Sequence, residues 1–574
     1  MLADQLGQQC EAIVRFPRLL EKYPFPILIN SALLKLADVF RQSCNFTRLC
    51  VLGVIRQSRR HLDKITNVDE LVKRLYTVLH ANDPVARALT LRTLGAIASI
   101  IPERKQVHHN IRNAFDSHDA VELHAAIAAA SAFAAQSKNF SVNMCDKISE
   151  MIRGYATPLH MKLKLIPIFQ HMHHDAKTAA VVRATCIDLL PGYPSEDFVL
   201  VTLHTLTLLA THTLVDIPDQ VQLLLGFLVD DARSSVKQAV LKDMRLLTGS
   251  DFGHIWSEAN ISSVIEFARS CDIRYRGSGP GSDEQVELCC GALSVLSDLA
   301  KQSIDKFSLV SSESPALKLT EKCCYSANLK VVAKSTQLLT LIATNCKKEF
   351  HCVEGVDVSG EAIMAIEALF LLLSSYEDDA GSDVGSDAAD GRKDGLVSIL
   401  KECLHCLVML CSVQPESCDQ FVDIVGGMLL QSGPVAMTLL CEVLAALGIM
   451  KRGVLKLLLP DICNTILALC ENDYDVDVPA ELKERKVKNL VLLTTILFQT
   501  LKGHQYSSEA EAALAETLRH VDSWSAYRIG RNACRYGHFE QASRIFAMNL
   551  GKVSSESLYY WLSGKPYYFT GLLF

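Results

Sequence analysis

The chain has 574 residues and a formal net charge of −7 at pH 7, with 49% hydrophobic but only 7% aromatic residues and 17 prolines. Because the apolar residues are mainly Leu, Ala, Val and Ile, the composition favours an all-α protein over the aromatic-rich, turn-rich chain of a β-sandwich. The small acidic charge excludes a protein held to nucleic acid mainly by its own net charge.

The twenty cysteines do not have the arrangement of a disulfide framework. Cys289-Cys290 and Cys323-Cys324 are adjacent pairs, which are poorly placed for bridging, and Cys441 is one of several in apolar helical stretches. We therefore expect reduced thiols that pack as small hydrophobic residues. Charged residues interrupt the first apolar stretch, and no run approaches ~20 unbroken apolar residues, so we expect neither a signal peptide nor a membrane span. The expected compartment is a reducing one, the cytosol or the nucleus.

The first predicted element is an atypical helical repeat over residues 8–41. Pro24 and Pro26 bias the residues before them toward extended backbone, and Ser31 can cap the helix that follows. Residues 45–65 predict another helix. These segments are consistent with the start of a helical array.

Residues 69–101 predict two amphipathic helices joined by one short turn. In the first helix Leu71, Leu75 and Val78 recur at three- and four-residue spacing, which gives the helix one apolar face. The turn ends in Asp83-Pro84, where the aspartate can cap the next helix and the proline suits its first position.

The second helix is expected to run from Pro84 to Ile101, where Pro102 stops it. Its apolar stripe consists of Ala88, Leu91, Leu94, Ala98 and Ile101, with Thr93 outside it. Arg87 lies within this stripe, so we expect its stem to follow apolar surface while its guanidinium reaches water. A lone helix pair cannot bury both stripes, so copies must stack on either side of it, as in an α-solenoid.

Degenerate copies of this pair recur along the chain. Their opening turns are Ser117-His118-Asp119, Asp230-Asp231, Ser326-Ala327-Asn328 and Ser432-Gly433-Pro434. The copy after Asp119 is rich in alanine, which predicts close helix packing. Asp83 and Asp119 are 36 residues apart, near the period of roughly 40 residues in armadillo and HEAT repeats. We therefore predict an all-α, armadillo- or HEAT-like α-solenoid.

Three polar stretches interrupt the array. Residues 274–283 and 472–481 predict loops. Residues 374–395 carry seven acidic side chains and few apolar ones, so burial cannot offset the ordering of this backbone, and we predict a disordered acidic insert. The predicted organisation is helical repeats over 1–373, the insert, and further repeats over 396–505.

The last segment, residues 506–574, has a different pattern. The spacing of Ala542 and Phe546 and the central Gly537 are typical of a tetratricopeptide-like helical pair. The final residues form an aromatic run without an amphipathic helix to cap a solenoid, so we expect this segment to be truncated.

The best candidate for chemistry is the run from Gln170 to Asp175. On a helix, His171, His174 and Asp175 would share one face and could hold a metal ion, as in a metal-dependent hydrolase. All three come from about one helical turn and no HExxH pattern accompanies them, so we favour exposed histidines at a helix end. We assign no catalytic, cofactor-binding or metal-ligating residue.

Two further motifs have structural interpretations. The pair Cys403 and Cys406 lies in an apolar helix without the second pair that a zinc module needs, so we predict core cysteines. Basic clusters, for which we favour solvated helix faces, occur at Arg56, Arg59, Arg60 and Lys64, and at Arg528, Arg531 and Arg535.

Several long segments resemble the family of Integrator complex subunit 7. They are residues 8–41, 82–87, 94–105 and 162–176, and the likeness returns at residues 524–561. By this resemblance the family normally begins upstream of Met1 and continues beyond Phe574, and the acidic insert is not one of its hallmarks.

The resemblance implies a nuclear, non-catalytic scaffold subunit, with the cytoplasm as a second location. Its partners would be other Integrator subunits and, indirectly, the RNA polymerase II machinery. The implied roles are small nuclear RNA 3′-end processing, promoter-proximal termination and DNA-damage checkpoint signalling, with no cofactor and no membrane, and with direct nucleic-acid contact left open. The alternatives are an armadillo-type adaptor in transport or vesicle coats and the metal-dependent hydrolase.

Overall fold

The computed structural model describes most of the chain as helices. The described residues are 2–249, 251–271, 280–326, 328–349, 353–379, 386–429, 432–471, 480–501, 506–552 and 555–571. The chain divides into two compact units, unit 1 over Met1–Trp256 and unit 2 over Ser257–Phe574. In the described ranges no strand occurs, and Ser311 and Glu354 form an isolated bridge.

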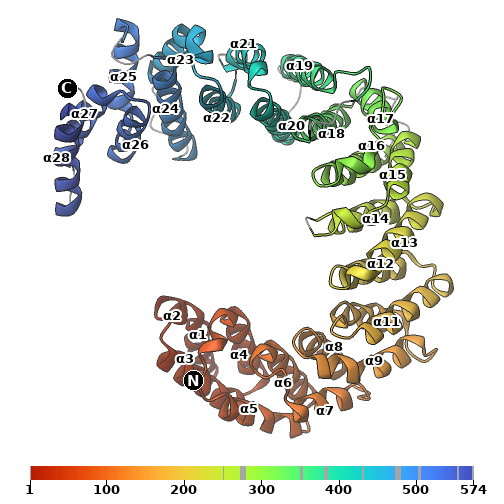
Figure 1. Cartoon of the computed structure of the whole chain (residues 1–574). Coiled ribbons are helices and arrows are strands. Elements are labelled where there is room, and N and C mark those ends of the chain that lie inside the picture. Colours follow the sequence, from red (N-terminus) through yellow and green to blue (C-terminus); the bar gives the residue numbers. More distant parts are fainter. Residues whose placement is uncertain are drawn as a thin grey trace. The chain divides into compact units, whose positions relative to one another are not determined.

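The helices follow one another with short connections (Figure 1). Those of unit 1 are α1 (Leu2–Val14), α2 (Phe16–Lys22), α3 (Pro26–Gln42), α4 (Asn45–Gln57), α5 (Val68–Tyr76), α6 (Pro84–Ala96), α7 (Lys105–Ala114), α8 (Ala120–Ala134), α9 (Lys138–Arg153), α10 (Leu159–Leu165), α11 (Ala176–Leu189), α12 (Glu196–Ala210), α13 (Ile217–Asp230) and α14 (Ser234–Leu246).

Unit 2 continues the same series (Figure 1). Its helices are α15 (Glu258–Ser270), α16 (Pro280–Ala300), α17 (Pro315–Cys324), α18 (Leu329–Lys348), α19 (Val358–Asp379), α20 (Ser386–Val413), α21 (Cys418–Leu429), α22 (Pro434–Met450), α23 (Leu459–Glu471), α24 (Ala480–Thr500), α25 (Ser508–His520), α26 (Ser523–Arg535), α27 (Phe539–Asn549) and α28 (Glu556–Gly571).

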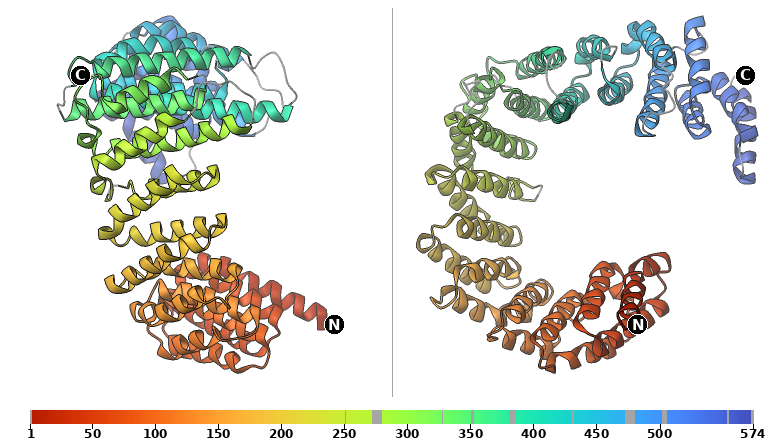
Figure 2. Two further views of the ribbon diagram at one scale, coloured as in Figure 1. Left: turned by 90° about the vertical axis from the view of Figure 1, so that its right-hand side faces the viewer. Right: turned by 180° about the vertical axis from the view of Figure 1, so that it is seen from behind.

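Within each unit the helices form two layers (Figures 1 and 2). The second helix of each pair packs on the second helix of the next pair, as α4, α6 and α8 do in unit 1 and α18, α20, α22, α24 and α26 do in unit 2. The first helices of the pairs form the other layer, in which α3 contacts α5 and α23 contacts α25. We call these the second-helix layer and the first-helix layer. This stacking is the α-solenoid arrangement predicted from the sequence.

Hydrogen bonds between successive repeats reproduce the predicted period. Asn45 Nδ2 donates to Asp83 Oδ2 at 2.6 Å, and these residues are 38 positions apart. Arg87 and Glu122, 35 positions apart, and His204 and Asp243, 39 apart, are paired in the same way. Each polar side chain therefore meets the equivalent helix one repeat away, as the period of roughly 40 residues requires.

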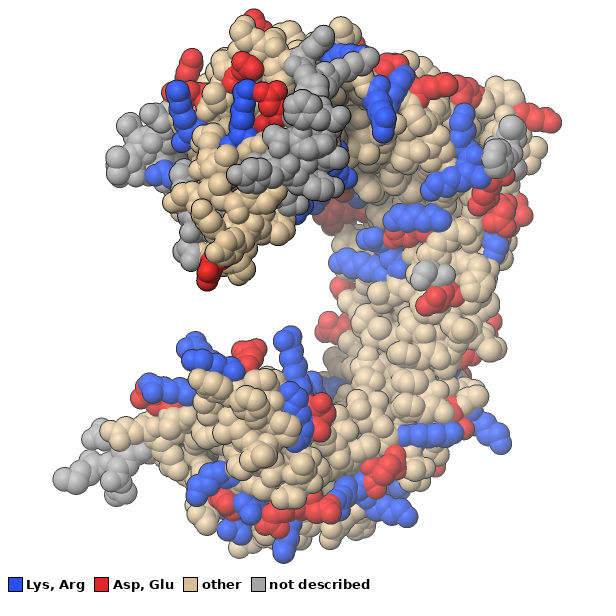
Figure 3. Space-filling model, turned by 60° about the vertical axis from the view of Figure 1, so that its left-hand side comes forward, with Lys and Arg blue, Asp and Glu red and all other residues tan. Residues whose placement is uncertain are grey.

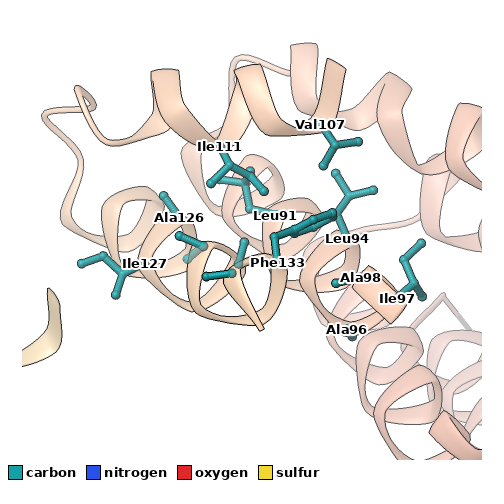
Figure 4. Packing of buried hydrophobic residues seen from close by; sticks show 14 of the residues in the cluster. Leu91, Leu94, Ala96, Ile97, Ala98, Val107, Ile111, Ala126, Ile127 and Phe133 are labelled. Atoms are coloured by element: carbon teal, nitrogen blue, oxygen red, sulfur yellow. The ribbon is translucent and has the colours of Figure 1, made fainter. Parts of the chain in front are cut away.

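The core of unit 1 is continuous from repeat to repeat. Leu91 and Leu94 of α6, Ile111 of α7 and Phe133 of α8 lie toward one another in Figure 4, and all four are at most 1% exposed. The predicted stacking on both sides of the pair at residues 69–101 is confirmed. One hydrophobic cluster joins the core residues of α1 to α12 rather than separate cores.

The alanine-rich helix packs as closely as expected. Ala125, Ala126, Ala129 and Ala130 of α8 are fully buried. A methyl group placed on Gly95 of α6 would lie 3.0 Å from the Ala129 Cα, so the two backbones approach as near as a glycine allows. Small residues on both helices are the physical reason for this contact.

Several predicted helix caps are present, but the one expected at Ser31 is wrong, because Ser31 lies inside α3. Asp83 accepts a hydrogen bond from the Val85 amide at 3.0 Å, and Asp119 accepts one from the Val121 amide at 2.9 Å. Asn328 caps α18 in the same manner, and Pro434 opens α22. The opening at Asp230-Asp231 is displaced, because α13 continues to Asp230 and α14 begins at Ser234.

Two expectations about α6 are wrong. The helix ends at Ala96 instead of Ile101, and residues 98–100 form a short 3-10 turn. Thr93, expected outside the apolar stripe, is fully buried because α6 has neighbours on both sides, and its hydroxyl donates to the Leu89 carbonyl at 2.7 Å. A helix inside a stack is buried over more than one stripe, which a single amphipathic pattern underestimates.

The head group of Arg87 does not reach toward water as expected. Its Nε and Nη2 donate to the two carboxylate oxygens of Glu122 at 2.9 and 2.8 Å, and its Nη1 donates to the Ala81 carbonyl at 2.9 Å. The exposed fractions of the two side chains are 26% and 11%. Arg87 is therefore a bridge between α6 and α8 rather than an exposed cation.

The interrupting stretches are only partly described. Of the predicted acidic insert, the backbone of residues 374–379 belongs to α19 and that of residues 386–395 to α20, while residues 380–385 lie outside the described residues. The two flanks of the predicted insert are therefore helical rather than disordered. For residues 380–385 disorder stays a prediction. The loops expected at 274–283 and 472–481 lie mostly outside the described residues, and α16 and α24 begin at their ends.

One stretch of α20 is apolar enough to bear on the expectation of no membrane span. Among the described residues, Gly395–Val413 of α20 is long enough and, with a mean hydropathy of 1.8, apolar enough to cross a membrane. Cys403, Leu407 and Leu410 are at most 1% exposed, and α20 packs against α18, α19 and α22. The stretch is 39% buried, and we interpret its buried side as part of the core of unit 2.

The C-terminal helical pair has the turn expected from its glycine. Gly537, with φ of +84°, reverses the chain between α26 and α27, and the His538 amide bonds back to the Ala533 carbonyl at 2.9 Å. Phe546 of α27 packs beside Gly530 of α26. A further helix, α28, follows where no amphipathic pattern was expected, and Leu562 on it is buried.

Candidate functional site

The three residues of the hydrolase hypothesis do not share a helix face. His171 ends a short 3-10 helix, His174 lies in the following turn and Asp175 caps α11. The Asp175 carboxylate accepts hydrogen bonds from the amide and hydroxyl of Thr178 at 3.1 and 3.0 Å. Within the described ranges no group of three His, Cys, Asp or Glu side chains could hold a metal ion.

The histidines instead stack on one another. The His173 ring lies 4.3 Å from the His174 ring and 4.2 Å from the ring of His212, which follows α12. Burial, with a smaller effect of the neighbouring imidazoles, lowers the pKa of His171 and of His173. The lowered pKa values favour neutral rings for His171 and His173 at neutral pH. The expectation of exposed histidines is wrong, because His171, His173 and His174 are all partly buried.

The prediction of core cysteines is confirmed for the pair on α20. Cys403 is fully buried and Cys406 is 1% exposed. Burial raises the pKa of the Cys406 thiol to about 12, so it stays protonated and unreactive. Most other described cysteines are also buried free thiols, whereas Cys44 is exposed and Cys352 lies outside the described residues.

Grooves on the surface offer binding sites rather than reaction centres. One groove, of about 1030 Å³, is lined by the first turns of α22, α24 and α26, with Trp524 and Arg528 on one side, and we call it the large groove. A second groove of about 650 Å³ lies at the opposite ends of the same three helices and includes Arg452, Lys456 and Arg535. Sequence reasoning did not find these grooves, because their walls come from three repeats.

Charged side chains of both signs are dispersed over the surface that Figure 3 shows. Figure 3 shows Lys, Arg, Asp and Glu side chains interspersed over the visible face, without one broad field of a single sign. In the basic cluster of unit 1, Arg56, Arg59 and Arg60 are exposed, and Lys64 donates to the Pro24 carbonyl at 3.3 Å. Recognition by such a surface must rest on narrow local features.

The fold places the chain among HEAT-repeat α-solenoids. A solved structure of yeast importin β is similar over 99% of this chain and 77% of that protein, with a TM-score of 0.60 and 11% sequence identity. A crystal structure of importin β from a polyethylene glycol condition is similar over 94% of this chain and 70% of that protein, with a TM-score of 0.58 and 10% identity. At these identities the likeness concerns the fold alone.

Sequence comparison identifies the family. The family model for the N-terminal region of Integrator complex subunit 7 matches residues 1–538. Integrator complex subunit 7 of Mus musculus is 42% identical over 571 residues, and that of Drosophila melanogaster is 36% identical over 583 residues. These matches cover 98% and 97% of this chain but 55% of each relative. The chain belongs to the Integrator complex subunit 7 family, and it spans about half the length of these relatives.

Proposed function

We propose that this protein is a non-catalytic scaffold subunit of the Integrator complex. The observation that carries the proposal is the family match along nearly the whole chain, on a fold that consists of stacked helix pairs. A solenoid exposes both helix layers and both edges of each repeat, which is ample surface when a stable interface needs about 800 Å² per partner.

The absence of a catalytic role is part of the proposal. The most suggestive residues, His171, His174 and Asp175, are held by separate local hydrogen bonds and packing contacts. The described cysteines with strongly raised pKa values, such as Cys406, are poor nucleophiles. We therefore expect the purified protein to show no hydrolytic turnover of its own.

The more specific roles follow from the family and stay part of the same proposal. They are support of small nuclear RNA 3′-end processing and of promoter-proximal termination by RNA polymerase II, with a contribution to DNA-damage checkpoint signalling. Such a protein works in the nucleus, so its proposed location is nuclear with a cytoplasmic pool. Its proposed contacts are other Integrator subunits, through which the polymerase machinery is reached.

Affinity purification tests the scaffold role. A tagged version of the chain, expressed in cells that contain Integrator, should recover the endonuclease and backbone subunits of that complex, as identified by quantitative mass spectrometry. Recovery of transport receptors or vesicle-coat subunits in their place would support the adaptor alternative and reject the proposal. An untagged parallel culture gives the background.

A further inference from the structure

A stripe of basic and aromatic side chains runs along one face of α26. Trp524, Arg528, Arg531 and Arg535 are spaced by four, three and four residues, which places them on one side of the helix, and all four are exposed. We call this set the α26 ridge. The opposite side of α26, with Ile529 and Ala533, is fully buried.

The arginines of the α26 ridge form no ion pair within the described residues. In the part of the chain that the structure describes, Arg528 and Arg531 have no ion pair, and Arg535 has only the Tyr536 ring, 6.0 Å from its guanidinium carbon. Some other arginines in the array are paired between repeats, as Arg87 is with Glu122 and Arg74 is with Asp38. Like charges three and four positions apart disfavour a helix slightly, so the ridge is a small cost to folding without a described internal partner.

Trp524 gives one end of the ridge an apolar anchor. Trp524 is 64% exposed, and its indole ring stacks on Tyr527, with ring centroids 5.4 Å apart. Tyr527 in turn packs against Phe546 and Trp561, so the exposed ring rests on a fixed support. Rigid, exposed tryptophans beside arginines are the residue types that dominate binding energies at protein interfaces.

Apolar side chains from α22 face the same groove. Val435, which is 37% exposed, and Leu439 line the large groove together with Trp524. The helices around it are held by hydrogen bonds between repeats, with Asn489 donating to the Pro434 carbonyl at 3.0 Å and Asn532 donating to the Thr495 hydroxyl at 2.7 Å. The groove is therefore a preformed surface with an apolar end, from which the ridge leads away.

The ridge continues into the second groove. Arg535 lines it together with Arg452 and Lys456, and its lining residues contain no acidic side chain among those described. Arg535 lies eleven positions after Trp524, so the ridge is about 16 Å long at about 1.5 Å of rise per residue. The ridge thus presents one apolar anchor followed by three exposed guanidinium groups that have no ion pair with a described residue.

We propose that the α26 ridge and its two grooves bind an acidic segment of a partner protein that carries an apolar residue next to its carboxylates. The apolar residue would pack on Trp524 and Val435, and the carboxylates would lie along Arg528, Arg531 and Arg535. This inference deepens the scaffold role proposed above and rests on it for its biological meaning.

The charge pattern favours a short acidic segment over nucleic acid. Glu481, Glu484 and Asp522 line the large groove beside Trp524, and hydrogen bonds from Ser525 lower the pKa of Asp522 and keep it charged. A nucleic-acid strand extends as a continuous row of phosphates and would meet these carboxylates, whereas a peptide can place a neutral side chain there. The net charge of −7 also opposes long-range attraction of polyanions.

A binding assay with the full chain tests this inference. The probe is a fluorescein-labelled synthetic peptide composed of Glu, Asp, Leu and Ser, read by fluorescence anisotropy. The comparison probes are the same peptide with Gln and Asn for the acidic residues and an oligouridylate of matched charge. We expect micromolar binding of the acidic peptide, at least about tenfold tighter than that of either comparison probe.

Variants locate the binding to the ridge. Arg528→Glu/Arg531→Glu/Arg535→Glu and, separately, Trp524→Ala should each weaken peptide binding about tenfold or more. The matched control is Arg56→Glu/Arg59→Glu/Arg60→Glu, which makes the same charge change on exposed arginines of unit 1 and should leave affinity within about twofold. Circular dichroism of every variant verifies that the helices persist.

Each outcome decides the inference. Equal effects of the ridge and control variants, or absence of peptide binding by the folded wild-type chain, would reject it, and tighter binding of the oligouridylate would assign the ridge to RNA instead. In cells, the tagged ridge variant should lose at least one Integrator subunit that the control variant retains. If the wild-type chain recovers no Integrator subunit but still binds the acidic peptide through the ridge, the scaffold proposal is rejected and the peptide-binding proposal stands.

Discussion

At the scale of single residues, hydrogen bonds between equivalent positions of successive repeats set the register of the stack. The pair of Arg87 and Glu122 links α6 to α8 with two charge-assisted hydrogen bonds in a mostly buried position. The hydroxyl of Ser117 donates to the same carboxylate at 2.8 Å. Together these partners satisfy both carboxylate oxygens of Glu122.

The ionisation of Glu122 makes this contact pH-dependent. The hydrogen bonds from Arg87 lower the pKa of Glu122 below its usual 4.5. Because the folded-state pKa is the lower one, the stabilisation is complete above the unfolded-state pKa and is lost as the pH falls through the folded-state pKa. We expect Glu122→Gln to lower the free energy of unfolding by about 2 kcal/mol at pH 7.

Urea denaturation followed by circular dichroism at several pH values measures this effect. The difference between wild type and Glu122→Gln should shrink below about pH 4, where the wild-type carboxylate takes up its proton. Glu11→Gln is the matched control, since the Glu11 pair with Arg15 is exposed on both sides and should change stability little at any pH. A pH-independent difference for Glu122→Gln would contradict the assigned cause.

At the scale of elements, the closeness of neighbouring helices depends on small residues at the contact. Gly95 of α6 faces Ala129 of α8 with no room for a side chain, whereas Gly53 of α4 has nothing within 4 Å of the position where a Cβ would lie. Both glycines are inside helices of the same second-helix layer. The two glycines have the same helical backbone conformation, and they differ in the distance to the neighbouring helix.

This difference predicts opposite effects of one substitution. Gly95→Val should lower the free energy of unfolding by about 1–3 kcal/mol, because the branched side chain forces α6 and α8 apart. Gly53→Val should be neutral or slightly stabilising, because valine has the higher helix propensity and meets no neighbour. Thermal melts of the two variants beside wild type make the comparison, and a loss of stability for Gly53→Val equal to that for Gly95→Val would contradict the packing argument.

At the scale of the whole molecule, the chain consists of two compact units built from the same kind of helix pair. Stability in such an array is a sum of repeat and neighbour terms, so a fragment folds when it retains the neighbours of its apolar faces. In unit 1 one hydrophobic cluster runs from Ile13 to Leu209. That cluster needs no residue of unit 2.

We therefore expect a fragment of residues 1–256 to fold by itself. Its helix content per residue should equal that of the full chain, and it should unfold in one cooperative step on heating. A fragment of residues 1–118 keeps α6 but lacks α8, which exposes Leu91 and Leu94, and it should aggregate or lose helix content. Circular dichroism and size-exclusion chromatography distinguish the two, and similar behaviour of both fragments would contradict a continuous core in unit 1.

The sequence alone determined the fold class, the repeat period and several helix starts of this protein. These features depend on local pattern: apolar residues at helical spacing, and Asp or Asn before a helix, as at Asp83 and Asn328. The family resemblance was equally a property of the sequence, carried by long segments such as residues 8–41. The core placement of Cys403 and Cys406 followed from the apolar pattern around them.

Only the tertiary structure decided which side chains meet across repeats. Helices about one repeat away determine the pairing of Arg87 with Glu122 and the burial of Thr93. The end of a 3-10 helix at His171 separates this residue from His174 and Asp175. The arginines of the α26 ridge were visible in the sequence as a basic cluster. The groove beside Trp524 and the groove beside Arg535 could be found only with three helices in place. Periodicity specifies the face a residue occupies within its helix, whereas the packing of neighbouring helices specifies its partner, and for this protein the partner determines the chemistry.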